Sequence, residues 1–372
     1  MTGPLGTVVH VSTPRSWRGG EQQLLYLAER LRGAGVPQLV VCPPGSEVER
    51  ACREREIPCA PLRRRASIDP LFARALARAS NEAGAAVVHA HDPHAHAAAV
   101  LGASLFGLEA PVVVHRRVDF RIGRGAFSRW KYDHPAVRRI VCVSRAIAEI
   151  VRPDLRDPSR LCVVHDGIDP ARFAGTRADG RLRREHGIPA GVPLVGNVAA
   201  LAGHKDHFTF VDTAARLVAD GLDARFFAIG EGPLRREIAA HVRRKGLDGR
   251  VVLTGFRPDL AAILPELDVF LFTSKEEGLG SSILDAYACR VPVVATAAGG
   301  VPEIVSDGET GLLAPVRDPA ALAAAVRRVL SDPALRARLV EGGARRVAEL
   351  GIDRMAERTL AIYREVAAER RA

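Results

Sequence analysis

The stretch TSKEEGLGSSILDAYACRVPVVATAAGGVPE, residues 273–303, decides the fold of this chain. It follows an apolar run of strand length, and its acidic, glycine-rich turn leads into a helical stretch, a second apolar strand and a Gly-Gly turn. The backbone N–H groups of residues 278–282 are therefore expected at the positive end of a helix, which suits an anionic ligand. Glu277 and Asp285 can accept hydrogen bonds from hydroxyl groups. Together these groups predict a site for a diphosphate joined to a polyol, which is the chemistry of a sugar nucleotide.

Apolar runs of strand length alternate with amphipathic helical stretches, as in parallel-sheet α/β folds. The 372 residues are too many for one ordinary core and favour two domains. A polar passage near 171–187 lacks an apolar period, so we expect a first domain over 1–172, a linker over 173–190 and a second domain over 191–352. Strands are predicted near residues 7–11, 38–41, 87–90, 112–115, 140–143, 161–164, 194–198, 224–229, 251–253, 269–272 and 293–295, and helices near 21–32, 69–83, 94–106, 208–219, 234–245 and 283–289.

The formal net charge of +10 at pH 7 is concentrated in the first half of the chain. There, 25 basic and 17 acidic side chains give residues 1–172 a net charge of +8. Arginine-favouring codon usage explains such a bias without any function, whereas the functional interpretation is docking on an anionic membrane surface or acceptor. Nucleic acid suits the chain less well, because aromatic residues make up only 5% of it and do not alternate with the basic ones.

Compartment is predicted from the cysteines and from the lack of long apolar runs. The six cysteines contain no C-x-x-C pair, which favours free thiols in a reducing cytoplasm. The uncharged run at residues 93–108 contains two histidines and falls short of the ~20 apolar residues that span a bilayer. The first residues lack the charged and apolar regions of a secretory signal. We expect a cytoplasmic protein that is soluble or peripheral on the inner face of the membrane.

Four histidines, in the run HAHDPHAH of residues 89–96, follow a predicted strand. One interpretation is a zinc site, because hydrolases of the metallo-β-lactamase type use the pattern H-x-H-x-D-H after a strand. Asp92 stands one residue too early for that pattern, so we expect no metal and keep a metallohydrolase as an alternative. Packing or capping is a simpler role for the other three histidines than for His91.

Two further loops follow predicted strands, at whose carboxyl ends the ligands of open α/β sheets gather. Arg116 and Arg117 follow the strand at 112–115 and can clamp a phosphate with their guanidinium groups, although pairing with nearby aspartates is the alternative. Gly19 and Gly20 precede the first helix and let the backbone approach a ligand, although a plain tight turn needs glycine too.

The stretch 273–303 resembles the retaining nucleotide-sugar glycosyltransferases of family four. Their signature is Glu, seven residues, Glu, followed by a Pro-Val-Val strand and a Gly-Gly-x-Pro-Glu turn. Here Glu277 is the first acid and Asp285 replaces the second, while PVV and GGVPE are intact. Another motif of the family, Gly-Arg-Leu-x-x-x-Lys, is matched at Lys205, but Ala200 stands at its arginine position.

This resemblance implies the GT-B architecture, an α/β fold in which two Rossmann-like, doubly wound parallel-sheet domains face a cleft. Residues 1–172 would then form the acceptor-side domain, the C-terminal helix 353–372 would return to it, and residues 191–352 would bind the nucleotide sugar. The resemblance implies a hexosyltransferase-type, metal-independent reaction without a cofactor, in which a sugar leaves a nucleotide diphosphate with retention of configuration. The family's usual work and the charge bias favour a cell-surface glycan, such as lipopolysaccharide, or a lipid-linked precursor as the acceptor.

The resemblance also implies roles for individual residues. His91 would lie beside the transferred sugar and Glu277 would bind its hydroxyls, so both are candidate catalytic residues. Because the motif's arginine is missing, we expect Arg116, Arg117 or His204 to neutralise the leaving diphosphate. The predicted donor-binding residues are Gly19, Gly20, Lys205, Gly230, Arg257, Gly278, Leu279, Gly280, Ser281, Ser282 and Asp285.

Other functions remain open besides the metallohydrolase. A non-hydrolysing sugar-nucleotide epimerase shares the architecture and needs no acceptor, and a member that only binds nucleotide sugars is compatible with Ala200 and Asp285. The sequence has no G-x-G-x-x-G before its first helix, no G-x-x-x-x-G-K-[ST], no Asp-x-Asp and no G-x-S-x-G. These absences disfavour dehydrogenases, P-loop kinases, metal-dependent single-domain transferases and serine hydrolases.

Overall fold

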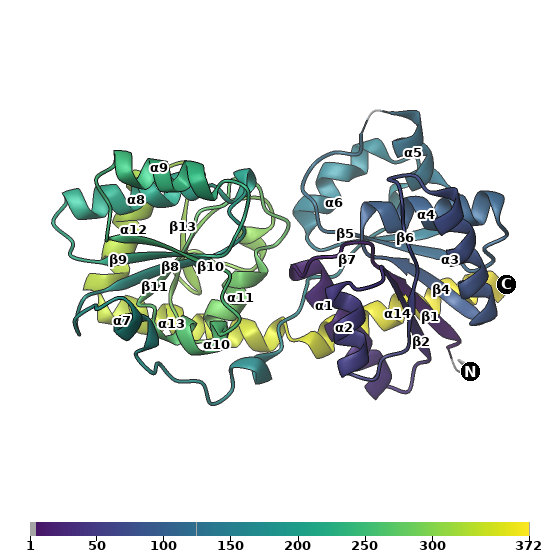
Figure 1. The fold of residues 1–372 in the computed structure, drawn as a ribbon, viewed down its shortest axis with the longest axis horizontal. Coiled ribbons are helices and arrows are strands. Elements are labelled where there is room, and N and C mark those ends of the chain that lie inside the picture. Colours follow the sequence, from purple (N-terminus) through teal and green to yellow (C-terminus); the bar gives the residue numbers. More distant parts are fainter. Residues whose placement is uncertain (1–4, 124, 372) are drawn as a thin grey trace. The chain divides into compact units, whose positions relative to one another are not determined.

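The computed structural model describes residues 5–123 and 125–371, which form two compact units (Figure 1). Unit 1 combines the chain up to Gly167 with the segment from Ile352 onwards, and unit 2 is the continuous segment Ile168–Gly351. Each unit has its own parallel sheet, which confirms the predicted α/β fold with two parallel-sheet domains. Within the described residues, no helix is both long and apolar enough to cross a membrane.

Unit 1 is built on a seven-stranded parallel sheet in the order β3-β2-β1-β4-β5-β6-β7. The strand order reverses between β1 and β4, and such a switch point leaves room for ligands at the carboxyl ends of the strands. The strands are β1 Thr7–Val11, β2 Gln38–Cys42, β3 Cys59–Pro61, β4 Ala85–Ala90, β5 Val112–Arg116, β6 Val137–Cys142 and β7 Leu161–Val163. The helices are α1 Gly19–Gly33, α2 Glu47–Glu54, α3 Pro70–Glu82, α4 Pro93–Leu105, α5 Ala126–Asp133, α6 Arg145–Val151 and α14 Ile352–Arg371, with 3₁₀ turns η1 Arg152–Asp154 and η2 Pro158–Arg160.

Helix α14 completes the hydrophobic core of unit 1. Its buried Met355, Tyr363 and Val366 lie on one stripe of the helix. They pack in one cluster with Val8 of β1 and Val87 of β4. Figure 1 shows this helix, in yellow, beside the purple and blue elements of the first part of the chain. Unit 1 is therefore assembled from segments that are far apart in the sequence.

Unit 2 is built on a six-stranded parallel sheet in the order β10-β9-β8-β11-β12-β13, so its switch point lies between β8 and β11. The strands are β8 Leu194–Val198, β9 Arg225–Ile229, β10 Val251–Gly255, β11 Val269–Phe272, β12 Val293–Thr296 and β13 Gly311–Ala314. The helices are α7 Arg181–Glu185, α8 His207–Ala219, α9 Arg235–Arg244, α10 Leu260–Ile263, α11 Ser281–Ala288, α12 Pro319–Ser331 and α13 Pro333–Glu349, with 3₁₀ turns η3 Pro170–Phe173, η4 Gly203–Lys205, η5 Leu264–Glu266 and η6 Val301–Glu303.

Several elements had no clear signal in the sequence. Strand β3 is only three residues long and β13 only four, too short for a visible period of two. The expected linker over 173–190 belongs to unit 2 and contains α7, in which only Leu182 is buried. The N–H of Leu182 donates to the Glu266 carboxylate at 3.0 Å, so this segment is anchored to η5.

Helix α13 packs closely against its neighbours through two adjacent glycines. A Cβ atom on Gly343 would lie 2.5 Å from Cδ1 of Tyr287 in α11, and one on Gly342 would lie 2.0 Å from the backbone oxygen of Glu309. The ring of Tyr287 is buried, and its hydroxyl donates to Oγ1 of Thr310 at 3.1 Å. Helix α11, which begins at the predicted site, is therefore held from behind by a contact that only glycine permits.

The close approach of Gly342 to the Glu309 oxygen predicts that alanine, normally favourable in a helix, destabilises the protein here. Gly342→Ala is expected to lower the free energy of unfolding by about 1–3 kcal/mol, because the new methyl group meets a backbone oxygen that cannot rotate away. The control is Gly33→Ala in α1, which has nothing within 4 Å and should be neutral or stabilising by up to ~1 kcal/mol. Thermal and urea unfolding measure both, and equal effects would contradict the packing argument.

Candidate functional site

The acidic turn that the sequence singled out lies at the switch point of unit 2. Strand β11 ends at Phe272, and α11 begins at Ser281. Gly280 precedes α11 with φ at +93°, a left-handed conformation in which a side chain would be strained. The first turn of α11 therefore presents backbone N–H groups at the carboxyl edge of the sheet, where an anion is favoured.

An ion pair occupies this edge. Nζ of Lys205, at the end of η4, lies 2.5 Å from Oε2 of Glu277, and the Ser274 hydroxyl donates to the same oxygen at 3.1 Å. The Lys205 and Glu277 side chains are largely buried, at 19% and 11% exposure. Two predicted residues are thus in direct contact, and their charges balance each other.

Backbone contacts hold the acidic turn against two other loops. The N–H of Gly300 donates to the carbonyl oxygen of Glu277 at 3.1 Å, and the N–H of Lys275 donates to the carbonyl oxygen of His204 at 2.9 Å. Gly299 has φ at +49°, and a Cβ atom there would lie 2.0 Å from the Glu277 oxygen. The Gly-Gly turn after β12 therefore fixes the backbone that carries the Glu277 carboxylate.

Asp285 lies one turn into α11 and is half-buried. Burial raises the pKa of this carboxyl group to about 6, and the positive charge of Arg172 acts in the opposite direction. The segment η3, which carries Arg172, packs against α11 within the same unit. Asp285 is therefore poised to change its charge close to neutral pH.

Gly230 has a steric role in the structure. A Cβ atom there would lie 2.1 Å from the Ala199 oxygen, so the loop after β9 packs backbone to backbone against the loop after β8. Arg257 is engaged in ion pairs, with Nη1 2.7 Å from the Glu185 carboxylate and Nη2 2.7 Å from the Asp259 carboxylate. Ligand contact by either residue stays a prediction.

In unit 1 the two predicted arginines diverge, because Arg116 is the last residue of β5 and successive side chains alternate sides. Arg116 is buried, and its Nη1 donates to the Tyr132 hydroxyl at 2.7 Å. Nε of Arg117 lies 3.3 Å from the Asp166 carboxylate, close to the N-terminus of α1, where a Cβ atom on Gly20 would be 3.7 Å from Cδ of Arg117. The structure therefore brings Arg117 to Gly19 and Gly20, which are the first two residues of α1 rather than a turn before it, and commits Arg116 to the interior.

The histidines of residues 89–96 also contact different parts of unit 1. His91 is buried, and its Nε2 lies 3.1 Å from Nδ1 of His10, a partner in β1 that the sequence analysis did not identify. Burial lowers the pKa of His91 well below its ordinary value. His94 turns towards the Ser67 carbonyl, and His96 binds the Lys131 carbonyl oxygen at 2.9 Å. The four histidines of the run therefore do not converge on one point.

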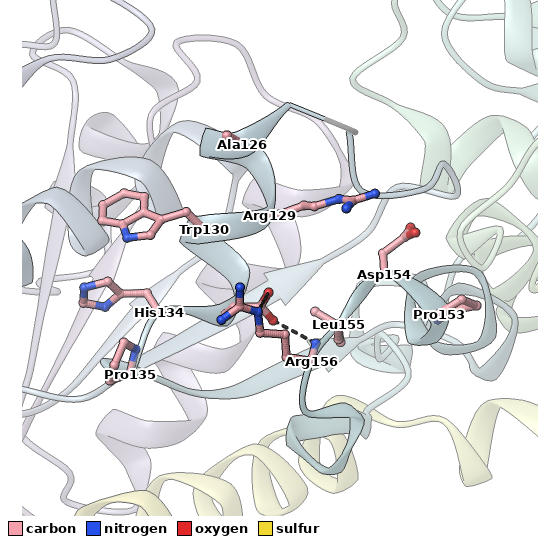
Figure 2. Close-up of a pocket in the computed structure, with 10 residues that line it drawn as sticks. Ala126, Arg129, Trp130, His134, Pro135, Pro153, Asp154, Leu155 and Arg156 are labelled. Atoms are coloured by element: carbon pink, nitrogen blue, oxygen red, sulfur yellow. Dashed lines mark hydrogen bonds and ion pairs between the residues drawn. The ribbon is translucent and has the colours of Figure 1, made fainter.

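A pocket of about 840 Å³ in unit 1 contains none of the predicted residues (Figure 2). It lies beside α5 and the turn after α6, where the backbone N–H of Arg156 donates to the Asp133 carboxylate at 3.0 Å. Its lining residues are Ala126, Arg129, Trp130, Asp133, His134, Pro135, Pro153, Asp154, Leu155 and Arg156. No sequence motif marks this pocket, whose two walls come from residues 126–135 and 153–156.

Two family models match most of the chain. Residues 17–172 match the model described as Glycosyltransferase Family 4, and residues 179–346 match the one described as Glycosyl transferases group 1. The chain is 34% identical over 255 residues to a 2-deoxystreptamine glucosyltransferase of Streptomyces kanamyceticus, covering 66% of this chain and 65% of that protein. It is 32% identical over 208 residues to the lipopolysaccharide core biosynthesis glycosyltransferase LpsE of Rhizobium meliloti, covering 55% of this chain and 57% of that protein. The matches thus span less than two thirds of these relatives.

Solved structures extend the likeness to the whole fold. A glycosyltransferase from Rickettsia africae has a TM-score of 0.84 at 18% identity, covering 97% of this chain and 98% of that one. The Anabaena protein HepE, crystallised with UDP and glucose, has a TM-score of 0.84 at 18% identity, covering 96% and 99% of the two chains. With both of its halves matched by family models, this chain belongs to the family-four type of glycosyltransferases with the GT-B fold.

Proposed function

We propose that the protein transfers a sugar, with retention of configuration and without a metal, from a nucleotide-diphosphate sugar to a hydroxyl group of an acceptor. The observation that carries the proposal is the contact between Lys205 and Glu277 at the start of α11. An ammonium group and helix N–H groups suit a diphosphate, and a carboxylate suits the hydroxyls of a sugar. Both family models, and the names of the relatives, support the same reaction class.

Donor binding would exchange one ion pair for two interactions. A diphosphate at the first turn of α11 attracts the Lys205 ammonium, which leaves the Glu277 carboxylate free to accept hydrogen bonds from the sugar. During transfer the leaving diphosphate gains negative charge, and preorganised positive groups stabilise it. Of the three residues considered for the charge of the missing arginine, His204 lies in unit 2 and directly precedes Lys205.

The proton of the acceptor hydroxyl would pass to an oxygen of the leaving diphosphate, so we assign no carboxylate as a general base. In this mechanism the acceptor attacks from the face that the leaving group departs from, which retains the anomeric configuration. His91 and Arg117 remain predicted residues of the acceptor side, in unit 1. Nuclear magnetic resonance of the product's anomeric proton distinguishes retention from inversion.

For the acceptor we propose a cell-surface glycan or a lipid-linked precursor, reached from an anionic membrane surface on the cytoplasmic side. The LpsE relative and the +8 charge of residues 1–172 support this choice. A small hydroxyl-rich acceptor is the second candidate, because relatives from Streptomyces are named for 2-deoxystreptamine. UDP sugars are the first donors to test, since UDP is bound in the HepE structure.

The reaction itself is tested by offering UDP, GDP and ADP sugars with a panel of glycan, lipid-linked and aminocyclitol acceptors. We expect one nucleotide sugar to stabilise the protein against heat and to give a glycosylated acceptor by mass spectrometry. Conversion of the nucleotide sugar to its epimer without an acceptor would instead identify an epimerase. Binding without turnover would identify a protein that only binds nucleotide sugars.

The role of the ammonium group predicts a loss of rate. Lys205→Met is expected to lower kcat/KM for the donor by about a hundredfold or more, because the leaving diphosphate loses a positive partner. The matched control is Lys245→Met, which should leave kcat/KM unchanged. Lys245 directly follows α9, and its ammonium pairs with the Asp212 carboxylate at 2.8 Å, away from the proposed donor site. Equal activity of the two variants would contradict the proposed donor site, provided that both unfold at similar temperatures.

The raised pKa of Asp285 predicts the acid limb of the pH profile. If the ionised carboxylate binds donor hydroxyls, kcat/KM should fall as the pH drops through about 6, where the group takes up a proton. Asp285→Asn should give a lower plateau and lose this limb, because an amide does not titrate. An unchanged limb near pH 6 in that variant would show that another group controls it.

A further inference from the structure

Four histidines of unit 1 form a buried group, which we call the histidine cluster: His10 of β1, His89 of β4, His91 just after β4, and His115 of β5. They are at most 8% exposed. His10 and His89 are register partners on adjacent parallel strands, and the N–H of His91 donates to the carbonyl oxygen of Val11 at 2.9 Å. The sheet therefore fixes these imidazoles side by side at its switch point.

Several ring nitrogens of the histidine cluster have no hydrogen-bond partner in the described part of the chain. Within the described residues, buried ring nitrogens without a hydrogen bond are Nε2 of His10, Nε2 of His89, Nδ1 of His91 and both nitrogens of His115. Burying an unpaired polar atom is unfavourable, and Nε2 of His89 is the one of these atoms that is available to a shared ligand; in His10 and His91 the nitrogens that face each other are Nδ1 and Nε2, which share a hydrogen bond. The nearby Asp166 carboxylate is already paired with Arg117, at 3.3 Å, and compensates its charge.

Three of the four histidines can reach a common point. Nδ1 of His10 and Nε2 of His91 are 3.1 Å apart, close to the ~3.3 Å between two nitrogens that bind one tetrahedral zinc ion. A ligand atom of His89 lies within 4.8 Å of both. Nδ1 of His89 is hydrogen-bonded to the Tyr363 hydroxyl of α14, which leaves its Nε2 for a ligand and orients the ring, as outer partners of metal-binding histidines do.

We propose that His10, His89 and His91 bind one late first-row divalent metal ion, with Zn²⁺ as the first candidate. Three neutral imidazoles without a carboxylate suit Zn²⁺, Co²⁺, Ni²⁺ or Cu²⁺, and do not suit Mg²⁺ or Ca²⁺, which need oxygen ligands. This set differs from the histidine run of the sequence, because His10 enters it and His94 and His96 do not. In the part of the chain that the structure describes, no other group of three or more His, Cys, Asp or Glu side chains has this arrangement.

The ion would act as a cross-link between β1 and β4 inside unit 1, and its binding is tested apart from the transfer reaction. An ion on Nε2 of His91 would replace the contact between this imidazole and the sugar that the family resemblance implies. In the test, the full chain is stripped with a chelator, dialysed, and mixed with ZnCl₂ or CoCl₂. We expect one ion per chain after gel filtration, by mass spectrometry of the metal, and a rise in Tm of roughly 5 °C or more. Bound Co²⁺ should show the visible d–d bands of a four-coordinate ion with three nitrogen ligands and one water.

Variants locate the ion. His10→Gln, His89→Gln and His91→Gln should each abolish the rise in Tm and the stoichiometric metal, whereas His94→Gln, in the same segment, should keep both. Retention of one ion per chain by His10→Gln or His91→Gln would overturn the proposal. If these variants do not fold by circular dichroism, the stripped wild-type protein decides alone, since absence of both the d–d bands and the Tm shift would also overturn it.

Discussion

The contact between the Lys205 ammonium and the Glu277 carboxylate is the interaction on which the candidate site depends. It joins the ends of two neighbouring strands, β8 and β11, at the switch point of unit 2. Neither charge is fully exposed, so each would be unfavourable without the other. The N–H of Gly300 donates to the backbone oxygen of Glu277, and Gly299 approaches that oxygen too closely for any side chain. Main-chain hydrogen bonds therefore fix the loops that carry Lys205 and Glu277.

Both units put their polar groups at the same place in the same kind of sheet. In unit 2, the reversal of strand order gathers the loops after β8, β11 and β12. In unit 1, the corresponding reversal gathers the α1 turn and the histidines of β1 and β4. The contents differ, however. Unit 2 offers a balanced ion pair next to a helix N-terminus, whereas unit 1 offers neutral imidazoles that are short of partners.

The sequence could predict what depends on neighbours in the chain. The β11–turn–α11–β12 segment has local periods and glycines that allow few alternatives, and the contact of Lys205 with Glu277 follows once the family motif is seen. Contacts set only by the folded sheet could not be read in this way. The pairing of His10 with His91, 81 residues apart, is one example. The burial of Arg116 is another, because strand alternation at the end of β5 decided which arginine faces inward.

The path of the chain through unit 1 has a consequence for the order of folding during synthesis. Unit 2 is one uninterrupted segment and has all its strands once Gly351 has left the ribosome. Unit 1 still lacks Tyr363 and Val366 at that moment, although its strands were made first. Until α14 emerges, the cluster around Val8 and Val87 has α1 as a neighbour but lacks the apolar stripe of α14, so part of its apolar surface is open to water and to other nascent chains. The half translated first is therefore the half that matures last, and a chaperone acting on this protein would find its apolar target there.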